Sequence, residues 1–157
     1  MTLPWRISAD DLDPAWASRA DAPAELPKLV RRLLWASVPL ASLTMRADAG
    51  VRLGGWDGVV VASAEHPFCP AGPSVWELSV AKDVRSKLND DFDRRAAEPP
   101  DRIDPASCTY VAVTARRFPA KAKWAHEKTQ AGPWQRVVVF DTNNLTSTLK
   151  TTPTITH

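Results

Sequence analysis

The chain of 157 residues contains only two cysteines, Cys69 and Cys108, and they lie far apart in the sequence. So few cysteines give neither a disulfide framework nor the spacing of a zinc site, and they favour two reduced thiols packed inside a cytosolic protein. The sequence also lacks any apolar run near the roughly 18 residues of a membrane span, and it has no signal-peptide core at its start. It therefore predicts a cytoplasmic location and no membrane partner.

The charge of the chain is nearly balanced, with a formal net charge of +2. Its distribution is uneven, because residues 1–26 are rich in acids and residues 101–136 are rich in bases. The two regions could pair with each other, or the basic region could face a phosphate backbone. Hydrophobic residues make up 44% of the chain, which suits one globular domain. Most of the seven tryptophans are expected in its core rather than stacked on bases.

Hydrophobic periodicity divides the chain into an arm over residues 1–22, one domain over residues 23–150 and a tail over residues 151–157. The domain pattern predicts, in order, a helix over 23–38, strands over 41–47, 57–64 and 74–81, a helix over 84–95, a strand over 108–115, a short helix ended by Gly132, a strand over 135–141 and a helix over 142–150. This order predicts an α/β protein whose mixed sheet has helices on its faces. The tail contains no closing element, so we expect either a cut within a longer protein or a disordered native tail.

Two acids and a lysine stand in segments that otherwise read as core. Asp57 lies in the turn GGWDG, Glu77 lies within the strand SVWELSVA, and Lys82 follows that strand. Acids on neighbouring strands can approach to about 5 Å across a sheet, and carboxylate oxygens are the ligands that Mg²⁺ prefers. A nearby cation can stabilise the charge that develops when a phosphodiester is cleaved. The three side chains therefore form a candidate metal site.

Each of the three residues also has a purely structural interpretation. Asp57 could be a turn former, since Asp and Gly dominate turns. Glu77 could be an edge-strand charge or the ion-pair partner of an arginine. Lys82 and Asp83 could simply begin the next helix, with Asp83 as its N-cap. A metal site requires that the side chains converge, whereas three independent charges need not meet.

The chain resembles the PD-(D/E)XK superfamily of restriction-endonuclease-like proteins. The resemblance rests on the order helix–β–β–β–helix–β, on an acid in the second strand and on a glutamate in the third. The strings GWDG and SVWELS..KD look like the nuclease-like domain found at the N-terminus of large bacterial proteins, many of which are NTPase-containing anti-phage defence proteins. The similarity runs from about Leu26 to the C-terminus. It implies a mixed sheet with an αβββαβ core flanked by helices.

The resemblance implies a DNA endonuclease that depends on Mg²⁺ or Mn²⁺ and serves as the effector domain of a bacterial defence protein. Asp57 matches the metal-binding acid of the second strand, and Glu77 matches the second acid. The superfamily pattern places a lysine two residues after that acid, where this chain has Ser79. Lys82 reaches the site only if the chain bends after the strand, and we prefer it slightly to Lys87 in the following helix. Further domains of a longer chain and a second copy of the protein are possible partners besides DNA.

Basic residues after the strand over 108–115 are candidates for binding nucleic acid. Arg116, Arg117, Lys121 and Lys123 would grip phosphates in a nuclease, whereas a charge run of this kind is otherwise a solvated loop. Glu25, near the start of the first helix, could be an auxiliary metal ligand or only a helix-start acid.

The sequence leaves a second function open. The departure at Ser79 and the tryptophan-rich arm favour a nuclease-derived module that has lost its chemistry and binds a protein or a nucleic acid. A Glu77 carboxylate paired with an arginine would favour this alternative. Double-stranded DNA, single-stranded DNA and RNA all remain candidate substrates.

Overall fold

The computed structural model describes residues 12, 14–45, 56–97 and 103–151. The helices are α1 (Pro14–Ala17), α2 (Ala22–Ser37), α3 (Val84–Ala97), α4 (Lys121–Ala131) and α5 (Thr142–Thr151), with a short 3-10 turn, η2 (Pro105–Ser107). The strands are β1 (Leu40–Met45), β2 (Gly58–Ala62), β3 (Gly72–Ser79), β4 (Thr109–Thr114) and β5 (Arg136–Phe140). Of the predicted arm and tail, residues 1–11, 13 and 152–157 lie outside the described residues.

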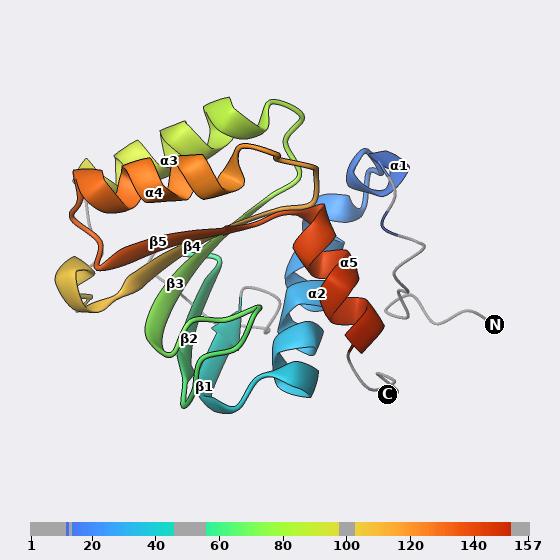
Figure 1. The fold of residues 1–157 in the computed structure, drawn as a ribbon. Coiled ribbons are helices and arrows are strands. Elements are labelled where there is room, and N and C mark those ends of the chain that lie inside the picture. The colour runs from blue at the N-terminus through green and yellow to red at the C-terminus, as the bar shows by residue number, and fades with distance from the viewer. Residues whose placement is uncertain (1–11, 13, 46–55, 98–102, 152–157) are drawn as a thin grey trace.

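The five strands form one mixed sheet in the order β1-β2-β3-β4-β5. The pairs β1–β2 and β2–β3 are antiparallel, whereas β3–β4 and β4–β5 are parallel. Parallel neighbours need a crossover connection, and α3 and α4 supply the two that this sheet requires. Figure 1 shows α3 and α4 together on one face of the sheet, with α2 and α5 on the other. The predicted mixed sheet with helices on its faces is confirmed.

Helix α2 follows from its apolar spacing, as predicted. Its buried side chains recur at helical intervals and face the sheet; they are Ala22, Leu26, Leu29, Val30, Leu33 and Leu34. Pro27 lies inside the helix, where its missing N–H removes the bond to the carbonyl of Pro23, but the helix continues past it. It ends at Ser37, because Val38 is extended with φ −112° as a residue before proline prefers.

Strand β3 separates two hydrophobic cores. Trp76 is fully buried in the core beneath α2 and α5, and Val75 is buried in the core beneath α3 and α4. Neighbouring residues of β3 therefore face opposite cores, as the alternation of side chains along a strand requires. Since both faces of β3 are covered, the carboxylate of Glu77 must point under a helix rather than into open solvent.

Most tryptophans lie in these cores, as expected. The buried ones are Trp16, Trp56, Trp76, Trp124 and Trp134. Among the described tryptophans, Trp35 is the exception, with 57% of its surface exposed near the end of α2. Cys69 and Cys108 are buried, free thiols. No helix in the described ranges combines the length and apolar character needed to cross a bilayer.

One edge of the sheet brings together several segments that carry candidate site residues. The carboxyl ends of β3, β4 and β5 meet at this edge because these strands run parallel. The amino end of β2 meets them there because β2 runs antiparallel to β3. Asp57 precedes β2, Ser79 ends β3, and Arg116 and Asp141 follow β4 and β5. The fold thus brings together polar residues that are far apart in the sequence.

Candidate functional site

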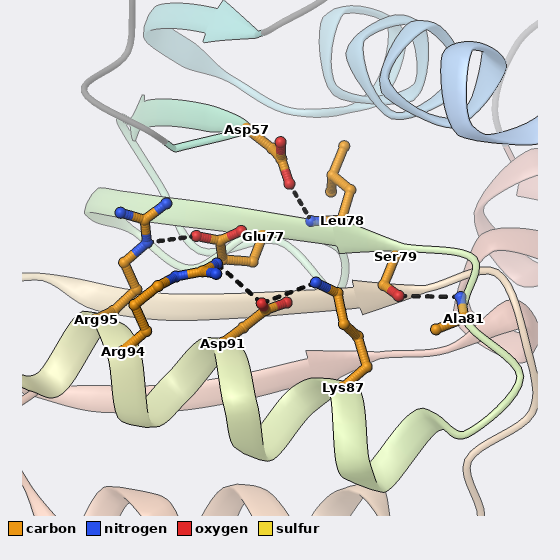
Figure 2. A network of polar contacts seen from close by, with 9 residues as sticks. All are labelled: Asp57, Glu77, Leu78, Ser79, Ala81, Lys87, Asp91, Arg94 and Arg95. Atoms are coloured by element: carbon orange, nitrogen blue, oxygen red, sulfur yellow. Dashed lines mark hydrogen bonds and ion pairs between the residues drawn. The ribbon is translucent and has the colours of Figure 1, made fainter.

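The first residue pair between β2 and β3 positions Asp57. Gly58 pairs with Trp76, so extending this antiparallel register by one residue places Asp57 across from Glu77. The Asp57 Oδ2 atom accepts a hydrogen bond of 2.8 Å from the backbone N–H of Leu78 (Figure 2). Asp57 therefore closes the ladder where β2 begins, which is a structural role in addition to any chemistry.

A cleft of about 390 Å³ lies beside Asp57. Its walls come from the first turns of α2 and from the chain that leaves β3, with Pro23, Ser79 and Lys87 among the lining residues. Asp57 and Lys87 therefore face the same space, although 30 residues separate them in the sequence. The residues that line the cleft thus include an acid, a serine and a lysine.

Glu77 has an arginine partner on the α3 side of the sheet. Arg95 Nε donates a hydrogen bond of 2.7 Å to Glu77 Oε1, and both side chains are largely buried, with exposures of 12% and 8%. The Arg95 guanidinium also lies over the ring of Trp56, 4.5 Å from its centroid. In Figure 2, Glu77 turns toward Arg95 and α3, whereas the Asp57 carboxylate lies on the other side of β3. This pair is the arrangement that the non-catalytic alternative anticipates.

Asp91 is a buried carboxylate that sequence reasoning missed. Its exposure is 4%, and its Oδ1 atom accepts hydrogen bonds of 3.0 Å from both Lys87 and Arg94. Lys87, Asp91 and Arg95 recur every four residues, so they occupy one face of α3. The i, i+4 spacing of these three charges was the available signal in the sequence. Asp91 holds the ammonium of Lys87 beside the cleft.

Burial raises the pKa of Glu77 to about 7, well above its ordinary value of 4.5. The hydrogen bond from Arg95 opposes this rise, while the charges of Asp57 and Asp91 add to it. The protonated and ionised forms of Glu77 are therefore both populated near neutral pH. A cation that needs the ionised form competes with a proton in this range.

Replacing Glu77 with glutamine is expected to change how stability depends on pH. The folded protein holds the Glu77 proton up to about pH 7, whereas the unfolded chain releases it near 4.5. Folding therefore takes up a proton between these values, so the contribution of Glu77 to stability falls by up to about 1.4 kcal/mol for each pH unit as pH rises through this window. Urea unfolding of both proteins across the window measures this slope. A stability difference that stays constant with pH would contradict the raised pKa.

The two candidate lysines lie in different surroundings. Lys82 is exposed and does not line the cleft, whereas Lys87 lines it. The chain does bend after β3, where the N–H of Ala81 donates a hydrogen bond of 3.1 Å to Ser79 Oγ. The continuation of the chain into α3 brings Lys87 to the cleft.

The predicted phosphate-binding residues are dispersed. Arg116 Nε donates a hydrogen bond of 2.8 Å to the carbonyl of Val80, and Lys121 Nζ donates one of 2.8 Å to the Asp141 carboxylate. Arg117 and Lys123 are exposed. Arg116 and Lys121 thus join segments of the fold, and Arg117 and Lys123 are accessible to a ligand.

Among the described residues, the candidate ligands for a metal ion are two acids, Asp57 and Glu77. Within residues 12, 14–45, 56–97 and 103–151, no group of three or more His, Cys, Asp or Glu side chains is arranged to hold one. Asp57 and Glu77 provide hard oxygen ligands of the kind that Mg²⁺ takes along with several waters. They fit the ion only if Glu77 exchanges Arg95 for it. Glu25 is instead 3.4 Å from Lys28, an ordinary contact in the first turns of α2.

Comparison with known proteins adds no assignment, since no family model, no curated protein and no solved structure matches the chain.

Proposed function

We propose that the chain is a DNA endonuclease of the PD-(D/E)XK type that depends on Mg²⁺ or Mn²⁺, serving as the effector domain of a bacterial defence protein. The observation that carries the proposal is the placement of Asp57 directly before β2, across from Glu77 of β3 when the register is extended by one residue, and beside a cleft that Lys87 also lines. The element order α2-β1-β2-β3-α3-β4 supports it, because this is an αβββαβ arrangement in which β4 runs parallel to β3.

Each residue of this site would have a separate task. Asp57 and Glu77 would hold the cation, which would act as a Lewis acid toward a phosphate oxygen and would lower the pKa of water. Lys87, held by Asp91 at 3.0 Å, would place a positive charge near the phosphate. The proposal requires the Glu77 carboxylate to leave Arg95 and turn toward Asp57.

Incubation of supercoiled plasmid with the purified chain and Mg²⁺ or Mn²⁺ tests the proposal. Asp57→Asn and Glu77→Gln are each expected to reduce cleavage by about 100-fold or more. Because Glu77 must be ionised to bind the cation, cleavage should also rise as pH increases through about 7. Asp90→Asn, an exposed acid on α3, is the matched control and should cleave as the parent does.

Absence of cleavage with either cation would count against the endonuclease. Cleavage that survives Asp57→Asn and Glu77→Gln would exclude this site in any case. The result separates catalysis by these two acids from contamination by another nuclease.

A second candidate function is a nuclease-derived module that binds without cleaving. The ion pair between Glu77 and Arg95 favours it, because a carboxylate held by a buried arginine is unavailable to a cation. Titration with Mn²⁺ distinguishes the two functions. If the chain is an endonuclease, Mn²⁺ should bind saturably and Glu77→Gln should weaken that binding. If it is a binding module, Mn²⁺ should not bind at this site.

A further inference from the structure

We propose that a second cleft on the same sheet edge binds a backbone phosphate of the nucleic-acid strand. This inference rests on the proposed function for its substrate class. The cleft has a volume of about 370 Å³ and lies between the end of β4 and the start of α5. Arg116, Arg117, Thr142, Asn143 and Thr146 provide its polar lining.

Among the described residues, the polar side chains that line this cleft can all donate hydrogen bonds, and none of them is a carboxylate. Arg117 is exposed, and its guanidinium has no partner among the described residues. The side chains of Thr142, Asn143 and Thr146 likewise make no hydrogen bond within the described part of the chain. Guanidinium, amide and hydroxyl groups are the side chains that contact phosphate oxygens in protein–DNA complexes.

The backbone at the start of α5 does not supply this site. The Asp141 side chain accepts a hydrogen bond of 3.0 Å from the N–H of Asn143, and its backbone carbonyl accepts one of 3.1 Å from the N–H of Leu145. The N–H of Thr142 donates to the carbonyl of Arg116. The helix end is therefore capped from within, and the candidate ligands are side chains.

The second cleft adjoins the cleft beside Asp57. Val80 lines the first cleft and Arg116 lines the second, and Arg116 Nε donates a hydrogen bond of 2.8 Å to the carbonyl of Val80. Arg116 also donates a hydrogen bond of 3.2 Å to the carbonyl of Ala17, so its guanidinium is fixed between the two clefts. A strand with one phosphate beside Asp57 would present a neighbouring phosphate to Arg117.

Binding of fluorescein-labelled DNA, measured by anisotropy in EDTA so that no cleavage occurs, tests this subsite. A short duplex and the matching single strand serve as probes. Arg117→Gln is expected to weaken binding about 10-fold at low salt and to reduce the slope of log K against log salt by about one. Asn143→Ala, which changes no charge, should weaken binding by a smaller factor that salt does not remove.

Arg136→Gln is the matched control, because it removes the same charge from an exposed residue at the start of β5 that lines neither cleft. It should weaken binding far less than Arg117→Gln does. Equal effects of both substitutions, or no effect of Arg117→Gln on either probe, would overturn the subsite. Since binding is measured without cleavage, a subsite that fails leaves the proposed acids untested, and acids that fail leave the subsite result intact.

Discussion

Replacing Arg95 with methionine is expected to lower the free energy of unfolding by about 3 kcal/mol near pH 8, where Glu77 is mostly ionised. The substitution leaves the buried Glu77 carboxylate without its positively charged partner. An unpaired buried charge destabilises the folded state by more than the intact ion pair stabilises it. Methionine retains much of the apolar contact with Trp56. Urea unfolding followed by tryptophan fluorescence provides the measurement.

A double-mutant cycle separates the ion pair from the packing. Glu77→Gln combined with Arg95→Met should recover much of the loss, because no unpaired charge remains. Arg94→Met is the control, since Arg94 is 56% exposed and its pair with Asp91 should contribute less than about 1 kcal/mol. The cost of Arg95→Met should also shrink near pH 5, where Glu77 is protonated. A cost that is equal near pH 5 and pH 8 would mean that Arg95 acts through Trp56.

This measurement also bears on the choice between the two candidate functions. A strong coupling between Glu77 and Arg95 means that a cation must displace a stable ion pair before it can bind. A weak coupling would make the exchange easy, which the endonuclease requires. The stability of one ion pair therefore decides how accessible the second acid is to a metal.

The fold could be predicted from local patterns. The alternation of β3 gives its two buried faces, and the helical spacing of Leu26, Leu29 and Leu33 gives the inner face of α2. These patterns reflect burial of apolar surface, which is strong and depends on residues close in the sequence. Gly132, with φ 69°, marks the end of α4 because few other residues adopt that conformation.

The arrangement of the charged side chains could not be predicted in the same way. Asp91 reads as a solvent-facing residue, and it is buried only because Lys87 and Arg94 neutralise it from the same helix. The choice between Lys82 and Lys87 depends on the direction of the chain after β3. Distant segments of the fold set that direction, and no local pattern records it.

Asp141→Ala is expected to lower the free energy of unfolding by about 3 kcal/mol at neutral pH. The Asp141 side chain is almost completely buried and accepts hydrogen bonds from the N–H of Phe118 at 2.9 Å, from Lys121 at 2.8 Å and from the N–H of Asn143 at 3.0 Å. It therefore joins the loop after β4, the first turn of α4 and the start of α5. Its removal leaves several donors unsatisfied. Urea unfolding measures the loss, and hydrogen exchange at Phe118 and Asn143 should locate it.

Asp104→Ala is the matched control for this prediction. Asp104 caps the short turn η2 through one hydrogen bond of 3.1 Å to the N–H of Ala106, and it is exposed. Its loss should cost about 1 kcal/mol or less, as for an ordinary cap. Asp141→Asn should fall between the two, because the amide keeps an acceptor but leaves Lys121 without an opposite charge. Equal losses for Asp141→Ala and Asp104→Ala would show that Asp141 only caps α5 and does not join the three segments.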